Sequence, residues 1–138
     1  MEKWYSHQLS LQELKQFIDE ARNGKNNKKV FIGNIIPEAS ERIKTICGKN
    51  VLRVMLESEG VRHSYKKAEH NLKDDDLLYI VDIINTATEI CLSGTTHQNN
   101  QCLEISKDID EKITFVMEVR IKYGGWLALV TCYRHKKE

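Results

Sequence analysis

The chain has no long hydrophobic run. Its apolar stretches are far shorter than the roughly 20 residues that a membrane-spanning helix needs. No apolar stretch follows a basic start at the N-terminus, so we expect no signal peptide. The sequence therefore predicts a soluble cytoplasmic protein that does not bind a membrane.

Cysteine patterns typical of metal sites and disulfide frameworks are also missing. The four cysteines form no CxxC pair and no zinc-site spacing, and three of them lie within apolar segments. We expect small buried side chains with free thiols, as in a reducing compartment. They are Cys47, Cys91, Cys102 and Cys132. No residue pattern points to a metal or another cofactor, and we expect none.

An excess of positive charge is absent as well. The 21 Lys and Arg residues nearly balance the 20 Asp and Glu residues, for a net charge of +1. Any basic binding site must therefore come from local clustering. The 138 residues, 41% of them hydrophobic, fit one domain with an ordinary core that needs no disulfide.

Helical and strand patterns both occur, which predicts an α+β domain. Ser10 and Glu13 form a capping box before a helical pattern that ends at Gly24, and residues 24–29 are a polar connector. Further helices are predicted over residues 39–47 and 58–70 and from residue 74. Strands are predicted over residues 30–36, 51–56, 89–92, 102–106, 113–123 and 126–133.

Two adjacent glycines, Gly124 and Gly125, predict a tight β-hairpin between the last two strands. A two-residue type I′ turn would pair Tyr123 with Trp126, because both central residues of such a turn need positive φ. Alternation then places an apolar face on the core. That face comprises Met117, Val119, Ile121, Tyr123, Trp126, Ala128, Val130 and Cys132. The opposite face carries Glu118, Arg120, Lys122, Thr131 and Tyr133, with Glu118 opposite Thr131.

The polar face of this hairpin has two interpretations. It is either the solvated side of a half-exposed sheet or a phosphate site. In the second case Arg120 binds the phosphate as a planar donor, while Thr131 and Tyr133 orient it.

A basic stripe is predicted on the helix over residues 58–70. Its members, spaced i, i+3, i+4 and i+7, are His63, Lys66, Lys67 and His70. The stripe is either solvated surface or a site in which His63, next to Arg62, acts as a general base. Histidines at this spacing are a poor pair of metal ligands.

Three segments together resemble a known family. They are residues 30–36 with the helix that follows Pro37, residues 61–67 (VRHSYKK) before an acidic helix start, and residues 127–133 (LALVTCY). In this order they are similar to the phage-borne barnase–EndoU–colicin–RelE-like nucleases, small toxin-type domains of phages and mobile elements. The resemblance covers residues 30–138 of a single nuclease-like domain, with residues 1–29 as a helical extension.

The resemblance implies helices packed on one face of a curved antiparallel sheet, with the other face open for RNA. His63 matches the histidine of the family's "RH", and Thr131 and Tyr133 match its C-terminal "TxY". The family often has a second histidine soon after the first. Here Ala68 stands near that place and His70 comes later.

The implied activity is that of a metal-independent endoribonuclease, in which the RNA 2′-hydroxyl attacks the adjacent phosphorus. His63 would be the base or the acid, with Arg120, Thr131 and Tyr133 holding the phosphate. The residues expected to bind the RNA backbone are Arg62, Lys66, Lys67 and His70. The expected partners are RNA, with tRNA as one candidate, and a cognate inhibitor protein.

Two other functions remain open. One is a non-catalytic RNA- or protein-binding module of a phage or mobile element on the same fold. The other is a regulatory or immunity partner that binds a protein through the polar sheet face. RNA cleavage in EDTA would distinguish the nuclease from both.

Overall fold

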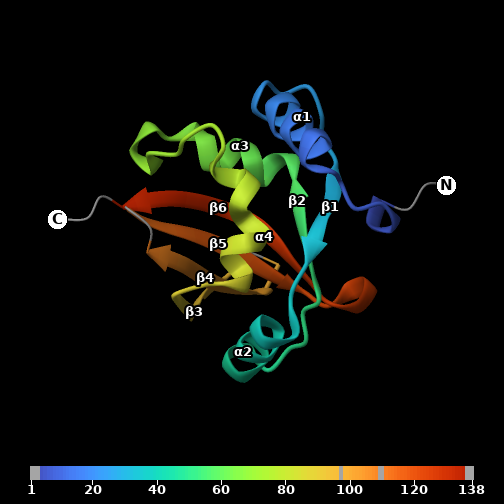
Figure 1. Cartoon of the computed structure of the whole chain (residues 1–138), viewed down its shortest axis with the longest axis vertical. Coiled ribbons are helices and arrows are strands. Elements are labelled where there is room, and N and C mark those ends of the chain that lie inside the picture. The colour runs from blue at the N-terminus through green and yellow to red at the C-terminus, as the bar shows by residue number, and fades with distance from the viewer. Residues whose placement is uncertain (1–3, 97, 109–110, 136–138) are drawn as a thin grey trace.

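A computed structural model describes residues 4–96, 98–108 and 111–135. These residues form one six-stranded sheet, in the order β1-β2-β6-β5-β4-β3, with helices on it (Figure 1). The strands are β1 (Lys29–Asn34), β2 (Arg53–Glu57), β3 (Glu89–Thr95), β4 (Gln101–Asp108), β5 (Lys112–Arg120) and β6 (Trp126–His135). The helices are α1 (Leu11–Arg22), α2 (Pro37–Cys47), α3 (Ser58–Lys66) and α4 (Ile80–Asn85), with short 3₁₀ turns η1 (Trp4–Ser6), η2 (Ala68–His70), η3 (Asp76–Tyr79) and η4 (Lys122–Gly124).

The predicted α+β class is confirmed, and the sheet is mixed. Neighbouring strands run antiparallel except β2 and β6, which pair in parallel over Arg53–Met55 and Trp126–Ala128. The C-terminal strand is thus inserted between the N-terminal pair β1–β2 and the strand β5 that precedes it. No helix in the described part of the chain is long and apolar enough to cross a membrane.

The main core lies between the helices and one face of the sheet. The capping box forms as predicted: the Glu13 amide donates to Ser10 Oγ (3.2 Å), and the Ser10 amide donates to Glu13 Oε1 (2.9 Å). The apolar stripe of α1 then joins the same buried cluster as Val61 of α3 and Ile83 of α4. The opposite sheet face is called the outer face below.

The outer face is partly covered. Phe31, Met55, Trp126 and Ala128 form a second buried cluster there, with Tyr5 packed against it. The Phe31 and Trp126 rings meet edge to face, with centroids 5.2 Å apart. The outer face is therefore apolar at its β1–β2 end.

The predicted hairpin exists, but its predicted register is wrong. Strand β5 ends at Arg120, which pairs with Trp126, and residues 121–125 form a longer connection. Glu118 lies opposite Ala128, while Thr131 lies opposite Val116. Both glycines have positive φ, but Gly125 packs so closely on residue 50 that a Cβ would meet the Asn50 carbonyl oxygen at 2.2 Å.

The error arises because residues 126–130 are apolar without alternation. Such a strand is buried on both faces, so a period of two does not identify the core side. Trp126 and Ala128 are buried on the outer face, while Leu127 and Leu129 enter the main core. Val116 pairs with Thr131 and Met117 with Leu129, so Val130 is an extra residue in β6. This extra residue changes which side chains of β6 face the main core, and Cys132 faces it as predicted.

The other side chains of the predicted apolar face differ in burial. Met117 and Val119 are in the main core, Val130 is half-buried, and Ile121 is 64% exposed. The predicted burial of the Tyr123 side chain lies outside what the structure describes. All four cysteines are free thiols; Cys102 and Cys132 are buried, whereas Cys47 and Cys91 are half-buried.

Candidate functional site

Four rings from three elements, α3, η2 and β6, form a row beside the outer face. The ring centroids of His63 on α3 and His70 on η2 are 6.5 Å apart. The His70 ring lies 6.1 Å from that of Tyr133 on β6, and Tyr133 lies 4.8 Å from His135. These four residues are called the histidine–tyrosine row. The structure thus brings together His63, His70 and Tyr133, which the sequence singled out in two separate segments.

Helix α3 reaches this row because it replaces β2 as the neighbour of β6. The parallel pairing with β2 stops at Ala128, and α3 begins immediately after β2. A Cβ on Gly60 would lie 2.3 Å from the Leu129 carbonyl oxygen, so the helix touches the strand backbone. This close approach places His63, one turn further on, beside the outer face.

The predicted single helix over residues 58–70 is wrong. Helix α3 ends at Lys66, Lys67 is extended, and Asn71 adopts a left-handed conformation (φ 56°). This turn directs His70 back, so that its Nδ1 lies 2.9 Å from the Ser64 carbonyl oxygen. The two histidines therefore meet through a chain reversal and not along one helical face.

The tautomer of His70 follows from this contact. A carbonyl oxygen only accepts hydrogen bonds, so Nδ1 must carry the proton. In the neutral ring Nε2 then has the free lone pair, as required of a general base. His70 is half-buried, whereas His63 is exposed.

Tyr133 is half-buried on the outer face and contacts a carboxylate. Its hydroxyl donates to Glu104 Oε1 on β4, at 3.4 Å. Burial, and next the Glu104 carboxylate, raise the pKa of Tyr133. The phenol therefore stays protonated and can act as a donor at neutral pH.

Thr131 lies two residues before Tyr133 on β6. Its Oγ1 is buried and has no hydrogen-bond partner among the residues that the structure describes. Such an oxygen costs folding free energy, and native structures keep few of them. The Thr131 hydroxyl can therefore form a further hydrogen bond, but a ligand reaches the oxygen only if neighbouring groups move.

Arg120 is already paired with two carboxylates. It donates from Nε to Glu118 Oε1 (2.6 Å) and from Nη2 to Glu57. Burial opposes the charge, but the hydrogen bonds from Arg120 to Glu57 and Glu118 raise its pKa overall. A phosphate would have to displace one of these carboxylates, which argues against the predicted clamp.

The predicted RNA-binding cations differ in their contacts. Arg62 donates to the Asn26 carbonyl oxygen (2.9 Å) and links α3 to the segment after α1. Lys66 and Lys67 are exposed. Among the described residues, the side chains of these two lysines form no hydrogen bond or ion pair, in contrast to Arg62 and His70.

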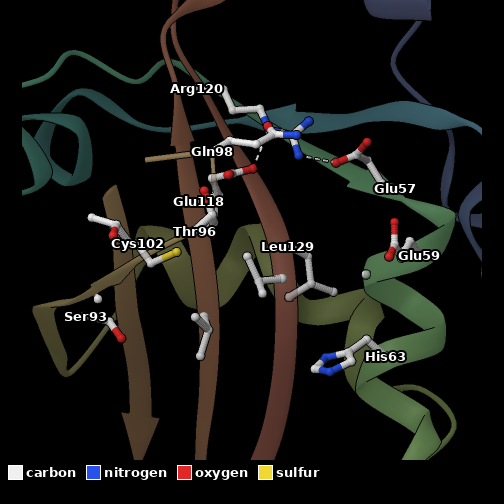
Figure 2. A pocket seen from close by; sticks show the side chains of 15 residues that line it. Glu57, Glu59, His63, Ser93, Thr96, Gln98, Cys102, Glu118, Arg120 and Leu129 are labelled. Atoms are coloured by element: carbon white, nitrogen blue, oxygen red, sulfur yellow. Dashed lines mark hydrogen bonds and ion pairs between the residues drawn. The ribbon is translucent and has the colours of Figure 1, made fainter. Parts of the chain in front are cut away.

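A groove of about 710 Å³ adjoins His63 on the outer face. It lies between α3, strands β3 to β6 and the residues after β3. Figure 2 shows Glu59 and His63 projecting from α3 on one side, with Ser93 and Cys102 on the other. Its charged lining comprises Glu57, Glu59, Glu118 and Arg120.

Sequence reasoning missed Glu59 and Glu104 as parts of this region. Glu59 stands four residues before His63, a spacing that places both on one helical face, and this signal was readable. Glu104 had no such signal, because its approach to Tyr133 depends on the order and register of β4, β5 and β6.

Comparisons of the chain with protein-family models, with curated proteins and with solved structures give no significant match. The nuclease resemblance therefore stays a prediction, and functional inference depends on the site itself.

Proposed function

We propose that this chain is a metal-independent endoribonuclease of toxin type, acting by 2′-hydroxyl transesterification. The proposal rests on the position of His70 between His63 and Tyr133. Its Nδ1 is bound to a carbonyl, and its Nε2 has no hydrogen-bond partner among the described residues. Two imidazoles about 6.5 Å apart can serve opposite sides of one phosphate as base and acid. The resemblance in residues 61–67 and 127–133 supports the same chemistry.

Each group has a defined step in this proposal. His70 Nε2 takes the proton of the 2′-hydroxyl, whose oxygen then forms a bond to phosphorus. The bond from phosphorus to the 5′-oxygen breaks, and protonated His63 gives that oxygen its proton. Thr131 and Tyr133, the latter once its hydroxyl has left Glu104, donate hydrogen bonds to the phosphoryl oxygens. The products are a 2′,3′-cyclic phosphate and a free 5′-hydroxyl.

The exposed Lys66 and Lys67 would attract the RNA backbone. A partner that inhibits this activity would cover the histidine–tyrosine row, as expected of a cognate inhibitor of a toxin. The choice of RNA, with tRNA as a candidate, belongs to the same proposal.

The test is cleavage of RNA by purified protein in EDTA, with analysis of the ends. We expect 2′,3′-cyclic phosphate ends and no cleavage of a substrate with 2′-deoxyribose at the cut site, since it lacks the nucleophile. His63→Ala and His70→Ala should each lower the rate at least ~10²-fold, the low end of general acid–base contributions.

His7→Ala is the matched control. His7 is an exposed histidine that contacts Glu13 near α1, away from the row, and this variant should keep full activity. Equal cleavage of the deoxy substrate, or full activity in both row variants, would overturn the assignment.

A non-catalytic RNA- or protein-binding module is the second candidate. The carboxylates of Glu57, Glu59 and Glu118 beside His63 favour its protein-binding form, because they repel the phosphates of RNA. Salt-dependent RNA binding without cleavage, or protein binding alone, is the result expected for that module.

A further inference from the structure

The groove beside His63 combines an aliphatic floor with a polar rim. Val116 and Val130 form part of its lining, as does Leu129, which also belongs to the main core. Thr95, Thr96 and Gln98 add hydroxyl and amide groups. Concave sites of this kind bind flat apolar bodies and orient them through a few polar contacts. A nucleobase has this character, since its faces are apolar and its edges carry donors and acceptors.

The charges of the groove determine which chemical groups of a ligand it can bind. Glu57 and Glu118 share Arg120, which leaves this trio with a net negative charge. In the part of the chain that the structure describes, the Glu59 carboxylate forms no hydrogen bond or ion pair, and it faces the groove from α3 (Figure 2). A phosphate is repelled here, whereas an N–H donor on an uncharged ligand is attracted.

We propose that this groove binds a nucleobase bearing an exocyclic amino group, with the Glu59 carboxylate accepting a hydrogen bond from that amine. The inference rests on the proposed ribonuclease function. His63 lines the same groove and also belongs to the histidine–tyrosine row, so the base in the groove is next to the phosphodiester at the row. The site thus prefers cytosine over uracil, because uracil presents a carbonyl oxygen where cytosine presents its amine.

Cytidine and uridine are the sharpest pair of probes, since the two nucleosides have nearly the same size and carry no phosphate. We expect cytidine to bind at least about fivefold more tightly, the low end of what a good side-chain contact to a base edge provides. The measurement is titration of the full chain, followed by NMR shifts of groove residues. Equal affinities, or no shifts in the groove with either nucleoside, would overturn the proposal.

Glu59→Gln tests the assigned acceptor. A carboxamide can donate to the uracil carbonyl oxygen, so this variant should bind both nucleosides about equally. Glu41→Gln is the matched control, because it removes an exposed carboxylate on α2 and should keep the preference for cytidine. An unchanged preference in Glu59→Gln rejects the role of Glu59. Binding of a lysine-rich peptide in the groove, without either nucleoside, would instead identify a cationic protein segment as its ligand.

Cleavage of poly(C) and poly(U) separates this inference from the proposed function. We expect faster cleavage of poly(C) by the unaltered chain and equal rates with Glu59→Gln, while His70→Ala loses both activities. Cleavage without a preference would leave the ribonuclease standing and refute the base site. Cytidine binding without any RNA cleavage would refute the ribonuclease and keep the base site.

Discussion

Thr131 carries a hydroxyl oxygen that is buried and unpartnered within the described residues. A buried hydroxyl without a partner destabilises the folded protein. The side chain lies on the strand that carries Tyr133, two residues away, where the proposed chemistry needs donors to the phosphate.

Thr131→Val should therefore change stability and activity in opposite directions. Valine has nearly the same shape and removes the unsatisfied oxygen, so the free energy of unfolding should rise by up to about 1 kcal/mol. RNA cleavage should fall by about 10²-fold, as when one donor to a developing charge is removed. Urea denaturation and initial cleavage rates measure the two effects. A loss of stability would mean that the hydroxyl has a partner in solution.

At the scale of elements, the contact between α3 and β6 determines the position of His63. Gly60 allows the helix to approach the Leu129 backbone, and Ser64 donates to the Gly60 carbonyl oxygen (2.8 Å) on the same buried side. The position of His63 depends on this contact, because the side chain projects from the following turn.

Gly60→Ala should destabilise the protein, although alanine favours helix by about 1 kcal/mol. The added Cβ would lie 2.3 Å from a backbone oxygen that cannot move without distorting β6. Such overpacking costs about 1–3 kcal/mol, and cleavage should fall with it because His63 is displaced. Thermal denaturation and RNA cleavage measure these losses.

Gly94→Ala is the control, since a Cβ there meets no atom within 4 Å. It should change stability by no more than about 0.5 kcal/mol. A stabilised, fully active Gly60→Ala protein would show that α3 does not approach β6 as closely as described.

At the scale of the molecule, a buried ion pair joins the start of η3, before α4, to the C-terminal strand β6. Arg134 donates from Nε and Nη2 to the two carboxylate oxygens of Asp76, both at 2.7 Å. The side chains are 10% and 3% exposed. Asp76 also accepts from the Lys73 amide, so this pair fastens the segment that carries His70 to the strand that carries Tyr133.

Asp76→Ala should cost about 3–5 kcal/mol of unfolding free energy, because it leaves a buried guanidinium without its partner. Replacing both side chains, with Asp76→Leu and Arg134→Met, should recover much of this loss. Urea denaturation followed by circular dichroism measures both. A loss below about 1 kcal/mol in the single variant would indicate that water reaches this pair.

The candidate site was only partly readable from the sequence. His63, Thr131 and Tyr133 were identified from short motifs and from the open side of a strand pair. Arg120 was assigned to a phosphate because the predicted register placed it beside Thr131. In the structure it pairs with Trp126 across the hairpin, and its side chain contacts Glu57 and Glu118. His70 was placed on the same helical face as His63 because its helix was taken to continue, whereas it lies in a separate 3₁₀ turn.

Sequence alone determined the features that short-range forces control. The capping box of α1, the helix and strand classes and the existence of a hairpin at Gly124 and Gly125 depend on neighbours a few residues apart. Strand order, the parallel pairing of β2 with β6, the five-residue connection and the return of His70 to Ser64 depended on tertiary structure. They are decided by packing between distant segments, such as Gly125 against Asn50 and Gly60 against Leu129, and a local pattern cannot contain these contacts.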